Sequence, residues 1–111
     1  MAETATLSSH VLDLGRGRPA AGLTVSLFDA SGDALARGVT DDDGRVTNWT
    51  PAVALTTGLY RLVFATGDWF AARGEDTLYP EVTIAFRIDS GEHYHIPLLL
   101  NAYGYSTYRG S

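Results

Sequence analysis

Short runs of alternating apolar and polar residues, separated by turn residues about every ten positions, fill this sequence of 111 residues. Strict alternation places apolar side chains on one face of an extended strand. The clearest runs are residues 6–14, 22–29, 34–40, 45–47, 58–65 and 81–88, with two more within residues 93–111. Roughly seven or eight short strands are typical of an antiparallel sandwich of two sheets. We therefore predict an all-β fold in a single domain, residues 1–111.

One segment, residues 66–74, departs from the alternation and predicts a short helix. Alanine favours its interior, Thr66 or Asp68 is expected to cap its start, and Gly74 is expected to end it. A helix of about two turns is unstable alone. Packing of Trp69 and Phe70 against the sheets therefore has to hold it in place.

The closing segment, residues 93–111, concentrates functional groups and predicts two strands joined by a turn at Asn101 and Ala102. Alternation turns one uniformly apolar set toward the core, namely Tyr94, Ile96, Leu98 and Leu100. The opposite face is too polar for a core and too apolar for a solvated surface. That face carries His93, His95, Pro97 and Leu99. On the partner strand, Ser106 and Tyr108 are expected to share a face.

Composition excludes several classes of function. The net charge is −5 at pH 7 and no basic cluster occurs, which argues against a nucleic-acid partner. The chain has no cysteine and no lysine, so thiol catalysis, disulfides, thiolate metal sites and Schiff-base chemistry are excluded. No apolar stretch is long enough to span a membrane, and no signal-peptide pattern opens the sequence. We therefore predict a cytoplasmic protein without a membrane partner.

The side chains with chemistry to offer lie far apart in the sequence, and they are His10, Arg45, His95, Ser106, Tyr108 and Ser111 with its carboxylate. His93 and His95 can chelate a metal from one strand face, but no nearby carboxylate completes a ligand set. The acidic run at residues 41–43 precedes Gly44 and predicts an Asx-type turn rather than a calcium loop. We therefore expect no metal and no cofactor. A serine triad is also unsupported, because no Gly-x-Ser-x-Gly elbow occurs.

Five segments together resemble one known family, the transthyretin-like 5-hydroxyisourate hydrolases of purine catabolism. The matching segments are residues 8–13, 43–45, 79–82, 93–99 and 103–111. The closing Tyr-Arg-Gly-Ser is the most specific motif, and the likeness departs at Asn101 and Ala102, where the family commonly has Ser-Pro. The resemblance implies a transthyretin-like sandwich assembled as a homotetramer, a dimer of dimers, with a channel at the interface between the dimers.

The same resemblance implies which residues line that channel. Position by position, the family's catalytic set is matched by His10, Arg45, His95 and Tyr108. Contacts to a small-molecule substrate are implied for Arg45, Ser106, Tyr108 and Ser111. The implied reaction is hydrolytic opening of the 5-hydroxyisourate ring to 2-oxo-4-hydroxy-4-carboxy-5-ureidoimidazoline. Transthyretin, a hormone carrier, resembles the chain in fold but has Lys, Glu, Thr and Thr at the four catalytic positions.

These residue types suit such a reaction. Imidazole titrates near neutrality, with an ordinary pKa of about 6.5, so either His10 or His95 can be the base that activates water. The sequence leaves open which of the two it is. Arg45 offers a planar fork of donors for substrate oxygens and for negative charge in the transition state. Tyr108 can donate a hydrogen bond or close the channel.

Two other functions remain open from the sequence. A small-ligand carrier of the transthyretin type would keep the channel but need no base, and turnover of 5-hydroxyisourate separates it from a hydrolase. A regulatory or accessory sandwich would bind through its edge strands. Replacing His10 and His95 would then change no activity.

Overall fold

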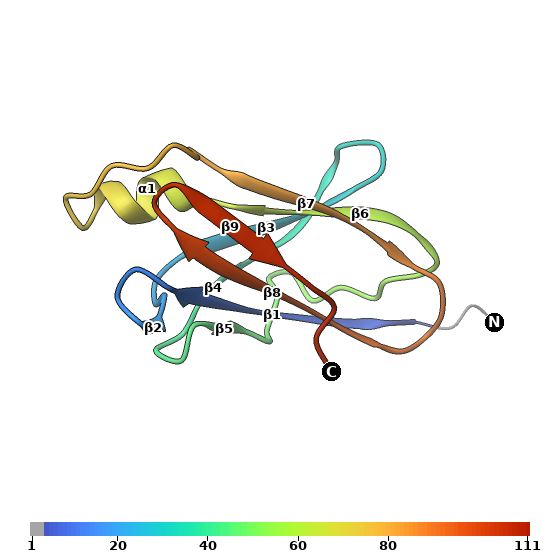
Figure 1. Cartoon of the computed structure of the whole chain (residues 1–111). Coiled ribbons are helices and arrows are strands. Elements are labelled where there is room, and N and C mark those ends of the chain that lie inside the picture. Colours follow the sequence, from blue (N-terminus) through green and yellow to red (C-terminus); the bar gives the residue numbers. More distant parts are fainter. Residues whose placement is uncertain (1–3) are drawn as a thin grey trace.

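Two sheets stacked face to face, with a short helix at one end, make up the computed structural model, which describes residues 4–111 (Figure 1). In chain order the elements are β1 (Thr6–Asp13), β2 (Arg18–Pro19), β3 (Thr24–Asp29), β4 (Ala34–Val39), β5 (Arg45–Val46), β6 (Gly58–Phe64), α1 (Thr66–Ala71), β7 (Val82–Ile88), β8 (His93–Asn101) and β9 (Gly104–Thr107). One sheet has the order β2–β1–β8–β9, with β5 also paired to β1. The other has the order β4–β3–β6–β7. Residues 1–3, part of the opening stretch without a signal pattern, lie outside the described residues.

The predicted sandwich is confirmed, with one pairing that alternation does not reveal. β1 and β8 run parallel, in register from Thr6 beside His93 to Asp13 beside Leu100. The other strand pairs within residues 4–111 are antiparallel. The two-residue strand β2 forms where the sequence predicts only a turn, because it pairs with the end of β1. Alternation reports the face that a side chain takes, but it does not report which strand lies alongside.

Burial confirms the predicted core face of the closing segment. The four inward residues of β8 are between 0% and 6% exposed, and they are Tyr94, Ile96, Leu98 and Leu100. The second sheet opposes them with fully buried side chains that include Leu27, Leu62 and Phe64. Burying one side chain of this kind contributes about 1.5–3 kcal/mol. Because this burial fixes which way β1 and β8 face, their opposite face is available for polar groups.

Helix α1 is shorter than the predicted residues 66–74, and the predicted side-chain cap is wrong. Ala65 occupies the N-cap position and no side chain bonds to the helix start. The Thr66 hydroxyl instead donates to the carbonyl of Tyr79 at 2.7 Å, a tertiary partner that local patterns do not reveal. Gly74, with φ of 70°, takes the left-handed conformation expected just after the helix. No helix within residues 4–111 has the length and hydropathy needed to cross a membrane.

The last hairpin also differs from its prediction. Asn101 pairs with Gly104, so the two-residue loop lies one position later than predicted. β9 ends at Thr107, and Tyr108 follows the strand instead of lying on it. The difference arises because the chain leaves the β8 ladder after Thr107, and alternation alone cannot show where a ladder ends.

Candidate active site

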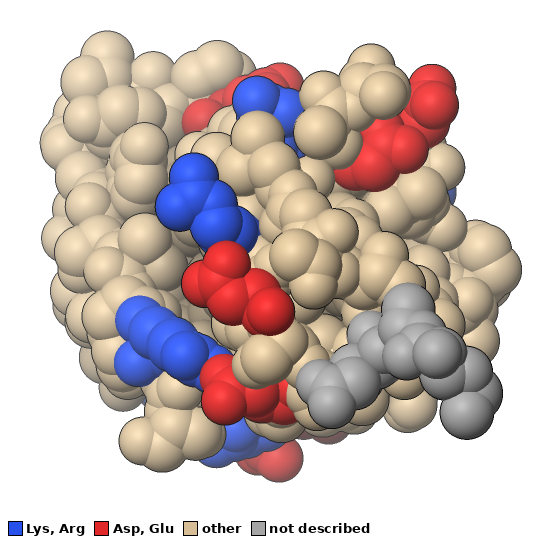
Figure 2. Space-filling view, turned by 90° about the vertical axis from the view of Figure 1, so that its right-hand side faces the viewer, with Lys and Arg blue, Asp and Glu red and all other residues tan. Residues whose placement is uncertain are grey.

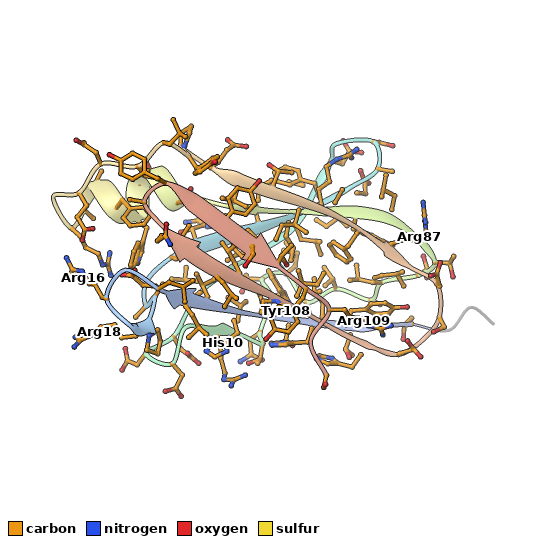
Figure 3. All side chains as sticks on the ribbon, in the orientation of Figure 1. His10, Arg16, Arg18, Arg87, Tyr108 and Arg109 are labelled. Carbon is orange, nitrogen blue, oxygen red and sulfur yellow. The ribbon has the colours of Figure 1, made fainter. Side chains whose placement is uncertain are left out.

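Three of the predicted site residues lie on the outer face of the first sheet. His10 is the register partner of Arg45 on β5 and of Pro97 on β8, so the three form a row across three strands. His95 is the partner of Ser8, one step along the same face. Figure 3 shows His10 projecting from β1 on the side away from the second sheet. The topology thus gathers two histidines and an arginine that are far apart in the sequence.

An Asx turn holds His10 and Arg45 in place. The Asp41 carboxylate accepts hydrogen bonds from the backbone N–H groups of Asp43 and Arg45, each at 2.9 Å. Gly44, at φ of 77°, supplies the left-handed residue, and a Cβ there would collide with the Val11 carbonyl. The acidic run is therefore a turn, as predicted, and it sets the start of β5.

The same turn fixes the tautomer of His10. The His10 Nε2 lies 2.8 Å from the backbone carbonyl oxygen of Asp43. A carbonyl oxygen only accepts, so Nε2 carries the hydrogen and donates it. The other ring nitrogen of neutral His10, Nδ1, is then left with its lone pair.

His95 is held on both sides. Its Nδ1 lies 2.7 Å from the Ser8 hydroxyl oxygen, and its backbone carbonyl accepts a hydrogen bond from the N–H of Gly110 at 2.8 Å. Gly110 packs so closely that a Cβ there would collide with the imidazole. Within residues 4–111 the His95 Nε2 has no hydrogen-bond partner, so this nitrogen is available to a bound molecule.

The surroundings of His95 favour its neutral form. Burial of the half-buried ring lowers the pKa of His95 below its ordinary value of 6.5, and electrostatic repulsion from Arg45 and from the neighbouring His10 and His93 lowers it further. Neutral imidazole is the form that accepts a proton. His95 therefore has the protonation state of a general base at neutral pH, and the Arg45 guanidinium on the same sheet face suits an anionic or oxygen-rich ligand.

Within residues 4–111 no side-chain hydrogen bond or ion pair joins the other predicted site residues to this cluster. Tyr108 is 58% exposed and flanks a groove of about 340 Å³ that opens between the edges of the two sheets. Ser106 is exposed and pairs with Leu99, which puts it on the outer face as predicted. Ser111 is exposed beyond the β-bridge of Gly110.

Sequence reasoning missed the hydroxyl groups that support the histidines. Ser8 is 7% exposed and its Oγ lies between His95 and the Nε2 of His93, 2.8 Å from the latter. The Thr6 Oγ1 in turn lies 2.6 Å from the Nδ1 of His93. The available signal was that Thr6, Ser8 and His10 share one face of β1. This shared face predicts a contact with His93 and His95 only when the pairing of β1 with β8 is known.

No metal or nucleic-acid site is apparent in the part of the chain that the structure describes. Within residues 4–111 no three His, Asp or Glu side chains lie close enough to hold a metal ion, and the absence of a metal stays a prediction. On the face shown in Figure 2, Arg side chains lie beside Asp and Glu side chains. Arg109 and Glu92 form an exposed ion pair of 2.7 Å. This face therefore lacks the broad basic surface that nucleic-acid binding requires.

Comparison with known proteins identifies close relatives over nearly the whole chain. The family model described as HIUase/Transthyretin family matches residues 7–110. A 5-hydroxyisourate hydrolase of Salmonella dublin is 47% identical over 109 residues, covering 95% of this chain and 80% of that protein. The solved structure of Klebsiella pneumoniae 5-hydroxyisourate hydrolase matches with a TM-score of 0.88 at 44% identity, covering 96% of this chain and 100% of that one. Transthyretin from Sparus aurata matches with a TM-score of 0.86 at 26% identity, covering 96% and 97%.

Proposed function

The chain belongs to the HIUase/Transthyretin family, and from this premise we propose that it is an enzyme, a 5-hydroxyisourate hydrolase. It opens the 5-hydroxyisourate ring with water to give 2-oxo-4-hydroxy-4-carboxy-5-ureidoimidazoline, a step of urate degradation. The observation that carries this function is the identity of 44–47% to hydrolases of that name, against 26% to a transthyretin. The two histidines and the arginine on one sheet face supply matching chemistry.

The roles of the site residues form part of the proposal. His95 takes the proton from the attacking water at Nε2, because that nitrogen is unoccupied and the ring is held neutral. His10, fixed through Nε2, presents Nδ1 to the substrate. Arg45 binds substrate oxygens and stabilises negative charge as the ring opens. Tyr108, Ser106 and Ser111 are proposed to contact the substrate from the end of the closing hairpin, and no cofactor takes part.

Turnover separates this hydrolase from the small-ligand carrier. Freshly generated 5-hydroxyisourate should lose its absorbance far faster with catalytic amounts of the protein than without it, and exhaustive chelation should leave that rate unchanged. A carrier would bind its ligand once per site and leave the rate of ring opening at the uncatalysed value. Loss of activity with EDTA, restored by zinc, would contradict the metal-free mechanism.

A homotetramer, a dimer of dimers, is the proposed assembly. β7 and β9 are each one edge of their sheet, and residues from both line the groove beside Tyr108. An exposed strand edge favours pairing with another chain, and a second copy related by a two-fold axis satisfies both edges at once. The outer face, with half-buried His95 and Leu99, would then be covered where two dimers meet. The single domain over residues 1–111 and the cytoplasmic location remain predictions.

Sedimentation at micromolar concentration should give a species of about four times the chain mass. The physical reason is that one copy leaves two adjacent edges and a partly apolar face uncovered. Leu99→Arg should shift the distribution toward dimers, since the charge of the new side chain would have to be buried between outer faces. A wild-type monomer with full activity would contradict the shared channel.

The acid side of the pH profile of kcat/KM should report His95. Because the pKa of His95 lies below 6.5, the neutral form of the ring is still the majority form at pH 6.5. Activity should therefore persist at pH 6.5 and decline only at lower pH, as the imidazole becomes protonated and can no longer accept a proton. An acid-side midpoint at or above 6.5 would be the opposite result.

A further inference from the structure

A continuous series of hydrogen bonds runs from His95 to the edge of the sheet, across the parallel pair β1 and β8. The His95 Nδ1 lies 2.7 Å from the Ser8 Oγ, which lies 2.8 Å from the His93 Nε2. The His93 Nδ1 lies 2.6 Å from the Thr6 Oγ1. All four side chains stand on the outer face of β1 and β8, which follows from their register.

The single hydroxyl hydrogen of Ser8 couples the tautomers of the two histidines that it contacts. The Ser8 hydroxyl has one hydrogen, so it donates to one imidazole and accepts an N–H from the other. When Ser8 donates to His93, His95 carries its hydrogen on Nδ1 and leaves Nε2 free to accept a proton. When Ser8 donates to His95, the hydrogen of neutral His95 is on Nε2 and His93 donates from its own Nε2. The tautomers of the two histidines are therefore set together by Ser8.

The series of hydrogen bonds also leads from buried or half-buried side chains to side chains that are exposed to solvent. Ser8 is 7% exposed and His95 is half-buried, whereas His93 and Thr6 are exposed. The charged and titratable groups that act on His95 are Arg45, His10 and His93. Of these three groups, only His93 is connected to His95 through a hydroxyl, and it therefore offers a hydrogen-bonded route for a proton from the His95 Nδ1.

We propose that Ser8 is a positioning residue and that Ser8 and His93 relay a proton from His95 to solvent. This inference rests on the proposed hydrolase function. His95 takes a proton from the attacking water at Nε2. It then releases its Nδ1 proton to Ser8 Oγ, while Ser8 passes its own hydrogen to the Nε2 of His93. His93 releases the proton on its Nδ1 toward Thr6 and solvent. His95 is left neutral with a hydrogen on Nε2. As that hydrogen passes to the departing ring nitrogen, the same series runs in reverse and returns a proton through Ser8 to the Nδ1 of His95, which restores its starting state.

Removing the Ser8 hydroxyl should lower the rate of the chemical step without weakening substrate binding. We expect Ser8→Ala to lose about ten- to hundredfold in kcat with little change in KM, and Ser8→Thr to retain most of the rate. Ser9→Ala is the matched control, because Ser9 is the next residue, is fully buried and bonds the carbonyl of Ile96 on β8 from the core face. It should keep kcat in its folded fraction. A rise in KM alone for Ser8→Ala would overturn the relay.

Solvent isotope mixtures give a readout that a merely structural role would not move. In wild-type protein, kcat plotted against the deuterium fraction should curve downward, since several protons move together. Ser8→Ala and His93→Gln should both give straight lines with reduced kcat. The relay would be overturned if Ser8→Ala kept the wild-type kcat, or if its plot of kcat against deuterium fraction were still curved.

Nitrogen-15 spectra of the labelled histidines test the coupling without turnover. In wild-type protein the His95 Nδ1 should show hydrogen bonding and a defined tautomer, and Ser8→Ala should remove both while the folded spectrum is kept. If the wild-type protein fails to open 5-hydroxyisourate, the proposed function fails and the relay with it, even where these spectra show the coupling. If it turns over but Ser8→Ala leaves the His95 signals unchanged, the relay alone is wrong.

Discussion

Replacing His95 with alanine should lower kcat for ring opening by about a hundredfold or more, with the protein still folded. The imidazole is the only group at that position that can accept the proton of the attacking water, and its Nε2 is free of other bonds within residues 4–111. Folding should survive because the ring lies on the outer face of β8, opposite the buried Ile96 and Leu98. Stopped absorbance assays together with circular dichroism measure both quantities.

Added imidazole provides the control for this variant. The space left by the His95 ring is bounded by Ser8 and Gly110, so free imidazole at millimolar concentration should enter it and restore part of kcat. The same addition should leave the wild-type rate unchanged. A His95→Ala protein with wild-type kcat would remove His95 from the catalytic set.

The second large effect is expected at Arg45. Arg45→Ala should lower kcat/KM by about a hundredfold or more, because a planar donor fork directed at developing negative charge contributes about 3–4 kcal/mol in comparable sites. Arg45→Lys should recover only a small part, since an ammonium group keeps the charge but cannot form paired parallel bonds. Arg37→Ala is the matched control, because Arg37 is an exposed arginine on β4 in the other sheet.

The same variant should also change the pH profile. Arg45 is one of the charges that lower the pKa of His95, after burial. Its removal should raise that pKa and move the acid-side midpoint of kcat/KM to higher pH. A large loss of activity with an unmoved midpoint would mean that Arg45 acts on the substrate but not on His95.

Alternation was sufficient to predict the two-sheet fold and the face that His10, His95 and Ser106 take on their strands. Leu98 and Leu100 are buried and His95 is directed outward because side chains in a strand alternate, whatever the neighbouring strand is. The turn before Arg45 was also predictable, because aspartate oxygens and a left-handed glycine form a local motif. Local rules thus account for the core, for this turn and for the direction of His10, His95 and Ser106, but not for Tyr108, which lies beyond the end of β9.

Relations between distant segments could not be predicted in this way. The pairing of His10 with Arg45 and of Ser8 with His95 depends on strand order. The family resemblance suggested a set of site residues but did not say which strands pair. Ser8 was overlooked as a partner of His95 for this reason. The local pattern also assigned Thr66 to a helix cap. Its hydroxyl instead bonds the Tyr79 carbonyl, which only the tertiary packing brings close to it. Strand order and tertiary hydrogen bonds decide these features, and neither leaves a periodic signal in one sequence.

The parallel pairing of β1 with β8 determines when this site can exist during folding. Ser8 and His95 are separated by 87 residues, so the ladder that joins them closes one of the longest loops available to the chain. Closing such a loop has an entropic cost that must be met before its contacts stabilise anything, and folds rich in distant pairings form slowly, in milliseconds to seconds. A nascent chain that has completed the second sheet through β7 still lacks β8, and with it His95 and the partner of Ser8. Catalytic competence therefore requires that β8 has been synthesised and has paired with β1, and a chain without that pairing is expected to be inactive.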